Sequence, residues 1–120
     1  MTSSSRTRIY LKKTCPYCLK LRIFLTEAGI AGNFDFTVFV DGDETHQATR
    51  ARMQAAGQEP SFPAAEIDGA LVTGSDELIA RFARDAGVDP TGLPLLTYYS
   101  EGVFRRHVEM HRELRELKSR

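Results

Sequence analysis

The chain has 120 residues, and its 16 basic and 16 acidic side chains cancel to a formal net charge of zero. This length suits one domain with its own core, and the balanced charge argues against nucleic acid or an anionic membrane surface as partners. No apolar stretch approaches the roughly 18 residues that a membrane-spanning helix needs. Because residues 1–6 lack the apolar run of a signal peptide, we expect a disordered tail there and a cytoplasmic protein.

The first two predicted elements are a strand over residues 8–11 and a helix that starts at Pro16. Proline suits the first helical position, because its missing N–H would have no partner there, and Gly29 ends the helix. The apolar residues of this segment recur at i, i+3, i+4 and i+7, as on one helix face: Leu21, Phe24, Leu25 and Ala28. The sequence therefore predicts a strand followed by an amphipathic helix.

A second strand and a more polar helix follow. Residues 34–40 alternate between apolar and other positions, which predicts a strand with one apolar face. The residues of that face are Phe34, Phe36, Val38 and Val40. Asp43 is a good N-cap for a helix that runs to Ala56 and is closed by Gly57.

A hairpin and a third helix complete the predicted domain. Asp68-Gly69 suits a type I′ turn between strands at 64–67 and 70–72, and Ser75 caps a helix that ends at Gly87. The order is βαβ, then α, then ββα. A βαβ unit implies parallel neighbours with a right-handed crossover, and the hairpin adds antiparallel strands. We therefore predict an α/β fold with a four-stranded mixed sheet flanked by helices.

Beyond residue 87 we expect a linker over 88–97 and an extra amphipathic helix over 98–118. Its apolar seam has spacings of 4, 3, 4 and 3 and consists of Val103, His107, Met110, Leu114 and Leu117. This helix either folds back over the sheet domain or pairs with another chain in a homodimer. His107 and His111 could supply half of a metal site, but no nearby pattern completes one, so we favour a packing role for His107.

The only two cysteines are Cys15 and Cys18, in the tetrapeptide Cys-Pro-Tyr-Cys. Two thiols in the first turn of a helix are close enough to form a disulfide, and the attacking species in disulfide exchange is the thiolate. The helix N–H groups and the nearby Lys12 favour a Cys15 thiolate, whereas Cys18 lies a turn further in. We therefore expect Cys15 to be the nucleophile and Cys18 the resolving thiol.

Two other uses of these thiols are less favoured. A structural disulfide across two intervening residues would close a very short loop and restrict the unfolded chain little. Zinc and iron–sulfur sites need about four ligands, so we expect no metal. The remaining metal alternative is a cluster shared between subunits with glutathione.

Several motifs resemble those of the glutaredoxins over about residues 8–86, within a domain that we expect over residues 7–87. They are the tetrapeptide, the preceding Lys12, the segment Ser61-Phe62-Pro63 and the turn Gly74-Ser75-Asp76. The resemblance implies a thioredoxin-like fold, a cis Phe62–Pro63 bond facing the thiols, and a glutathione-dependent thiol–disulfide oxidoreductase. Its co-substrate would be glutathione, and its substrates protein–glutathione mixed disulfides and protein disulfides.

The resemblance also implies roles for individual residues. Lys12, Pro16 and Tyr17 would stabilise the thiolate. Glutathione would be bound by the following set: Tyr17, Gln58, Phe62, Pro63, Gly74, Ser75 and Asp76.

One departure from the family concerns the glycine carboxylate of glutathione. Where the family commonly has a basic residue, this chain has Gln58-Glu59-Pro60. Glu59 would repel that carboxylate, and Gln58 could offer it a hydrogen bond. A second departure is Thr73, which stands where a glycine is usual.

Two alternative functions stay open on the sequence. The chain is similar to the N-terminal domain of glutathione S-transferases, in which a linker leads to the first helix of a second domain. A redox-sensing interaction module, in which a Cys15–Cys18 disulfide alters the exposure of the last helix, is the non-enzymatic alternative.

Overall fold

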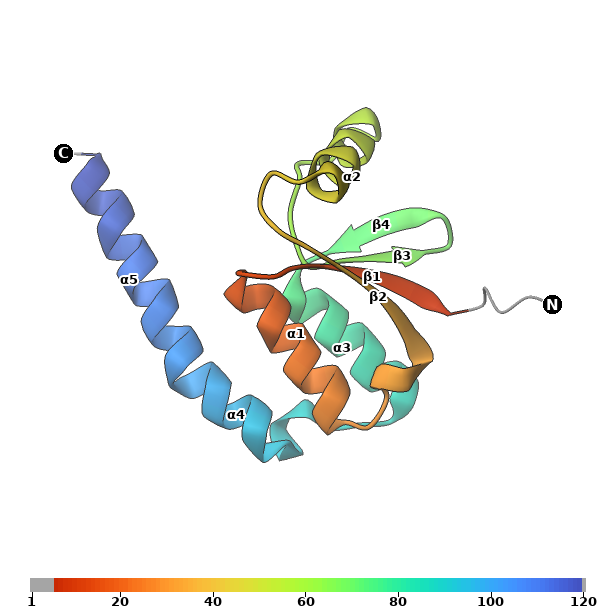
Figure 1. Cartoon of the computed structure of the whole chain (residues 1–120). Helices are drawn as coiled ribbons and strands as arrows, with labels where there is room; N and C mark the ends of the chain where they lie inside the picture. Colours follow the sequence, from red (N-terminus) through yellow and green to blue (C-terminus); the bar gives the residue numbers. More distant parts are fainter. Residues whose placement is uncertain (1–5, 120) are drawn as a thin grey trace.

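The computed structural model describes residues 6–119, so the predicted tail at 1–6 lies outside the described residues except for Arg6. Four strands form one mixed sheet in the order β2-β1-β3-β4. Helices α1 and α3 cover one face of the sheet, and α2 lies over the other face (Figure 1). The predicted four-stranded mixed sheet is confirmed. The elements of this domain are β1 (Thr7–Lys12), α1 (Pro16–Glu27), β2 (Phe34–Phe39), α2 (Glu44–Ala55), β3 (Ala64–Ile67), β4 (Ala70–Thr73) and α3 (Ser75–Ala86).

The strand pairing explains where the thiols lie. β1 and β2 are parallel, in register from Thr7 with Phe34 to Lys12 with Phe39, whereas β3 is antiparallel to both β1 and β4. Ligands of open α/β sheets bind outside the carboxyl ends of the parallel strands. Because α1 begins just after β1 ends, Cys15 lies at such an edge.

The main core lies between the sheet and helices α1 and α3. The predicted apolar face of β2 is only partly right, because Val38 is 53% exposed and Val40 47%, whereas Phe39 is buried. Val38 lines an open hollow beside the thiols. Phe39 points to the other face, where its ring stacks on His46 of α2 at 5.1 Å between centroids. The last residue of this edge strand, Phe39, therefore packs toward α2.

The start of α3 differs from the prediction in its cap. Gly74, not Ser75, is the N-cap, and its φ of 103° is one that residues with a side chain rarely adopt. Ser75 is the first helical residue and is buried. The Gly74 N–H donates to the carbonyl of Pro63 at 3.2 Å, which ties the start of α3 to the loop before β3.

The C-terminal region is more helical than predicted. A short 3₁₀ turn, η2 (Pro90–Gly92), leads to α4 (Pro94–Glu101), so four residues of the expected linker are helical. The Glu27 carboxylate of α1 accepts hydrogen bonds from the N–H groups of Leu95 and Leu96, each at 2.8 Å. A distant side chain thus satisfies donors that a helix start leaves open.

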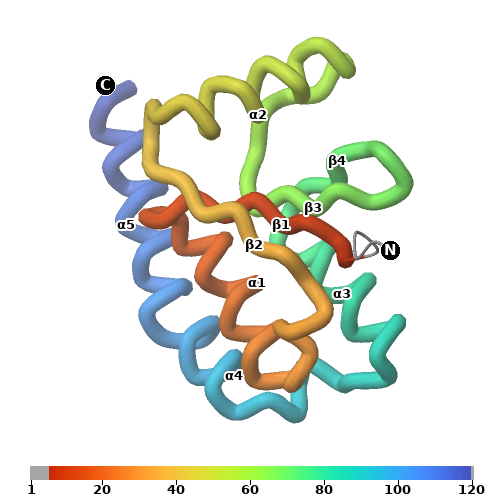
Figure 2. Tube along the Cα trace, turned by 45° about the vertical axis from the view of Figure 1, so that its right-hand side comes forward, coloured from red at the N-terminus to blue at the C-terminus, as the bar shows by residue number. Residues whose placement is uncertain are grey.

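A bend at Gly102 separates α4 from α5 (Val103–Lys118). α4 packs on α1, and its Leu96 and Tyr99 are buried. α5 continues past the start of α1 and away from the sheet (Figures 1 and 2). Within residues 6–119, none of the helices combines the length and the apolar character needed to cross a membrane.

Candidate active site

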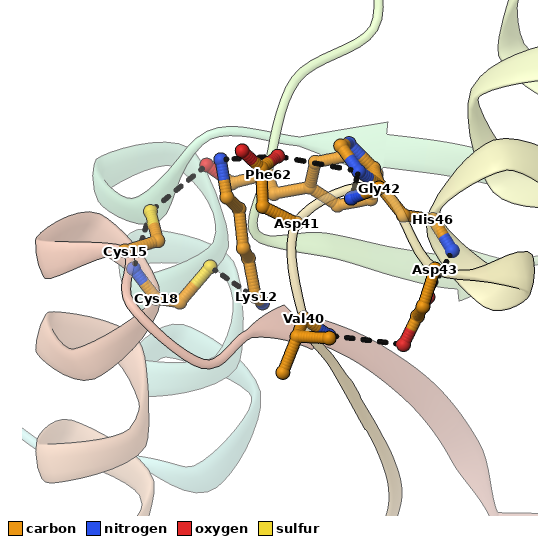
Figure 3. Close-up of polar contacts among 9 residues, drawn as sticks. All are labelled: Lys12, Cys15, Cys18, Val40, Asp41, Gly42, Asp43, His46 and Phe62. Carbon is orange, nitrogen blue, oxygen red and sulfur yellow. Dashed lines mark hydrogen bonds and ion pairs between the residues drawn. The ribbon is translucent and has the colours of Figure 1, made fainter.

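Cys15 occupies the N-cap position of α1, immediately before Pro16. Its backbone is extended, and its Sγ accepts a hydrogen bond from the Cys18 N–H at 3.4 Å. The same sulfur lies 3.9 Å from the carbonyl oxygen of Phe62 (Figure 3). The first turn of α1 therefore directs backbone N–H groups at a half-buried sulfur, an arrangement that stabilises negative charge.

These contacts lower the pKa of the Cys15 thiol from 9.0 to about 6. The largest cause is the side-chain hydrogen bond from Cys18, and the backbone N–H groups of Cys18 and Tyr17 lower the pKa further against the opposing effect of burial. The charge of Lys12 has the smallest effect. Its ammonium lies 3.2 Å from the Asp41 carboxylate, which offsets part of its field (Figure 3).

Cys18 has the opposite character. Its side chain is buried, with 2% of the residue exposed, and its Sγ accepts from the Lys12 N–H at 3.3 Å. The hydrogen bond that it makes to Cys15 raises its pKa, as do burial and the negative charge of Cys15. Cys15 is therefore the more acidic of the two thiols, and Cys18 keeps its proton while Cys15 is a thiolate. The assignment of Cys15 as nucleophile and Cys18 as resolving thiol stays a prediction.

The Phe62–Pro63 peptide bond is cis, as the resemblance implied. Pro63 is fully buried, whereas Phe62 is half-buried. The Phe62 ring packs edge-on against Phe39 at 4.8 Å and against His46 at 5.7 Å. These aromatic contacts hold the Phe62 backbone beside the Cys15 sulfur.

A polar hollow of about 370 Å³ opens on this side of Cys15, between α2 and the loop before β3. Three of its lining residues, Asp41, His46 and Arg50, were not predicted from the sequence. The buried His46 accepts a hydrogen bond through Nδ1 from the Gly42 N–H at 2.8 Å. No sequence motif marks these residues, because the packing of α2 on the sheet brings them to the site. A smaller hollow of about 160 Å³ lies on the other side of Cys15.

Three predicted glutathione-binding side chains already have partners within the chain. Gln58 donates through Nε2 to the Leu71 carbonyl at 2.8 Å. The carboxylate of the exposed Asp76 pairs with the Lys20 ammonium at 2.8 Å. Tyr17 packs edge-on against Phe104 of α5, with 5.1 Å between ring centroids.

The C-terminal helices α4 and α5 contact α1 at its first turn. The Tyr99 hydroxyl of α4 donates to the Pro16 carbonyl at 2.7 Å. Burial, and to a smaller degree the charge of Cys15, raises the pKa of Tyr99, so its hydroxyl remains a donor. The segment that carries Cys15 is thus braced by a residue 83 positions further along the chain.

Replacing Tyr99 by Phe is expected to lower the free energy of unfolding by about 1 kcal/mol, because a buried hydrogen bond is lost. Urea unfolding of the reduced protein measures this change. The matched control is Tyr98→Phe, since the neighbouring Tyr98 is 78% exposed. Equal unfolding midpoints for the two variants would show that the bond to Pro16 contributes nothing.

The packing role predicted for His107 is not seen within this chain. His107 and His111 both lie on the exposed surface of α5, and their rings stack on each other with 6.1 Å between centroids. The part of the chain described by the structure contains no group of three or more His, Cys, Asp or Glu residues arranged to hold a metal ion.

Comparison with known proteins agrees with this geometry. The glutaredoxin family model matches residues 8–72. The glutaredoxin 3 proteins of Escherichia coli strains K12 and O157:H7 are 31% identical over 86 residues, which cover 72% of this chain and 95% of theirs. The crystal structure of glutaredoxin 1 from Francisella tularensis complexed with cacodylate superposes with a TM-score of 0.53 at 25% identity, covering 68% of this chain and 96% of that one. The chain therefore belongs to the glutaredoxin family of thiol–disulfide oxidoreductases.

Proposed function

We propose that this enzyme reduces protein–glutathione mixed disulfides with glutathione as its co-substrate. The observation that carries the proposal is the Cys15 sulfur, half-buried at the start of α1 with a pKa of about 6. Its thiolate attacks the glutathione sulfur of the mixed disulfide, the disulfide bond breaks, and the protein thiolate leaves and takes a proton from water. The thiolate of a second glutathione then attacks the glutathione sulfur bound to Cys15, which releases glutathione disulfide and restores the Cys15 thiolate.

Protein disulfides require Cys18 as well. Cys15 attacks one sulfur of the substrate and forms a mixed disulfide, and Cys18 then attacks Cys15 and releases the second substrate thiol. Once Cys15 is in a disulfide, it no longer carries the charge that raises the pKa of Cys18. The proton of Cys18 passes to the departing substrate thiolate, and glutathione reduces the resulting Cys15–Cys18 disulfide.

The proposed glutathione site places the cysteinyl backbone of glutathione along Phe62, beside the Cys15 sulfur. The γ-glutamyl carboxylate meets the first N–H groups of α3, where Gly74 makes no side-chain cap hydrogen bond. The Asp76 carboxylate pairs with the γ-glutamyl ammonium and keeps its ion pair with the Lys20 ammonium. Tyr17 and the buried Pro63 shape the entrance.

The glycine carboxylate of glutathione needs a different partner from the one the sequence suggested. The Gln58 side chain donates a hydrogen bond to the Leu71 carbonyl and is therefore directed at the β3–β4 hairpin. Lys12 and Arg50 line the same hollow as Cys15 and Phe62, and Glu59 lies in it as well. We therefore assign the carboxylate to the positive charges of Lys12 and Arg50.

Replacing Arg50 by Gln is expected to raise the KM for glutathione about two- to fivefold, as the loss of an exposed ion pair predicts, with kcat little changed. Glutathione-coupled turnover of a glutathionylated peptide measures both constants. Arg105→Gln, at an exposed position on α5, is the charge-matched control. A KM for the Arg50 variant equal to that of the control would remove Arg50 from the site.

The proposed partners are glutathione, glutathionylated or disulfide-containing proteins, and a second copy of the chain through its C-terminal helix. We place the enzyme in the cytoplasm, where thiols are kept reduced.

The experiment that tests the function is glutathione-coupled reduction of a glutathionylated peptide by the wild-type chain. Turnover supports the proposal. Conjugation of a chlorinated aromatic compound without peptide reduction would instead indicate a transferase. A redox-dependent oligomeric state with no turnover of either compound would indicate a sensing module.

A further inference from the structure

α5 is a helix with an apolar face that the sheet domain leaves uncovered. Its seam consists of Val103, His107, Met110, Leu114 and Leu117, and the four apolar members are 48–68% exposed. None of the residues 103–118 is buried. The radius of gyration, 15.3 Å, exceeds the roughly 14 Å expected for a compact chain of this length, which agrees with a helix that extends past the domain (Figure 1).

The seam does not face the chain's own domain. Phe104 and Val108 are the half-buried residues of α5, and the Phe104 ring meets Tyr17 and the Lys20 ammonium of α1. Successive residues of an α-helix point about 100° apart, so the seam that includes Val103 is turned well away from α1. A lone helix of 16 residues is marginal in water, and an apolar stripe of this length needs a covering surface.

The charges beside the seam indicate what covers it. Arg106 and Glu113 lie one heptad apart on the same edge, each directly before a seam residue. Within one chain the exposed Arg106 guanidinium lies 3.4 Å from the Glu109 carboxylate and 3.7 Å from that of Glu113, and exposed pairs of this kind exchange at little cost. When two such helices run antiparallel, Arg106 of each faces the partner's Glu113. The seam layers then pair Val103 with the partner's Leu114, and His107 with the partner's Met110. The charged edge of one α5 helix is thus complementary to the same edge of a second copy.

We infer that two copies of this chain associate through their α5 helices, antiparallel about a twofold axis that passes between residues 108 and 109. This inference rests on the proposed homodimer and not on the thiol chemistry. The antiparallel arrangement places the two sheet domains at opposite ends of the helix pair, which avoids crowding beside α1. A parallel pair would instead bring His107 against the partner's His107 and Arg106 beside the partner's His111. The short seam predicts a reversible dimer that dissociates on dilution.

The test uses the full chain under reducing conditions, so that no intermolecular disulfide forms. Sedimentation equilibrium of the wild-type protein should give a concentration-dependent dimer. In the Arg106→Glu variant both edge positions, 106 and 113, are acidic. In the Glu113→Arg variant both are basic. Each variant alone should raise the dimer dissociation constant at least about tenfold, because two attractive pairs become repulsive.

Mixing the two single variants in equal amounts should restore a 1:1 dimer, because every facing pair then has opposite charges. Glu116→Arg lies on the opposite face of α5 and should leave the dimer unchanged, and Leu114→Glu should abolish it. Circular dichroism checks that each variant keeps its helix.

A wild-type chain that stays monomeric at all concentrations would overturn the inference. So would a dimer that the Arg106 and Glu113 variants leave unchanged, or a mixture that does not associate. Peptide reduction should be unaffected by these substitutions, so a failed dimer and a failed redox function are separate outcomes.

Discussion

Replacing Cys15 by Ser is expected to abolish the reduction of a glutathionylated peptide, with a loss of at least about a thousandfold. A serine hydroxyl is not ionised near neutral pH and cannot replace the thiolate that attacks the disulfide. The N-cap position tolerates this change, since serine is itself a good N-cap, so the variant should fold. Glutathione-coupled peptide turnover measures the loss, and circular dichroism checks the fold.

Cys18→Ser is the matched control for this prediction. It should keep most of the turnover of the glutathionylated peptide and lose the reduction of protein disulfides, since only the second reaction uses Cys18. The Cys18 N–H that donates to Cys15 is part of the backbone and remains in the variant. Residual activity of Cys15→Ser near the wild-type level would show that a different group attacks the disulfide.

The domain around the thiols was largely predictable because its signals are local. The Asp68-Gly69 turn has φ values of 52° and 82°, as a type I′ turn requires. Asp43 caps α2 through its hydrogen bond from the His46 N–H at 2.9 Å. Dipeptides and caps of this kind fix turn geometry within a few residues, so a single sequence is enough to recognise them.

What the sequence could not predict depends on distant partners. α4 starts four residues before the predicted helix because Glu27 supplies its cap from α1, 68 residues away. Arg50 lines the same hollow as Cys15 only because α2 packs through Met53 on the sheet, and Asp41 lies in the loop that leads to this helix. Gln58 has a polar side chain suited to a ligand, but its bond to Leu71 requires the hairpin to be in place.

The reactivity of Cys15 should follow a titration with its midpoint near pH 6, the pKa of the thiol. About nine tenths of the sulfur would then be thiolate at pH 7, against a few per cent for an unperturbed cysteine. The rate of alkylation by iodoacetamide, measured from pH 4 to pH 10 on the reduced wild-type protein, tests this, because the buried Cys18 has a raised pKa and keeps its proton. The Cys18→Ala variant is the comparison. That variant lacks the side-chain hydrogen bond that contributes most to the shift, so its midpoint should lie above that of the wild-type protein.

The same shift links the stability of the reduced protein to pH. The pKa of Cys15 is lower in the folded state than the ordinary value of 9.0, so its contribution to stability is complete above about pH 9. That contribution is lost as the pH falls toward 6, because the unfolded chain binds the proton first. The pKa of Cys18 is raised instead, and its contribution is constant below pH 9. Urea unfolding of the wild type and Cys15→Ser should therefore show a stability difference that shrinks from pH 9 to pH 6. A difference independent of pH in this range would mean that the folded protein holds Cys15 as an ordinary thiol, and the backbone contacts of α1 would then not account for its reactivity.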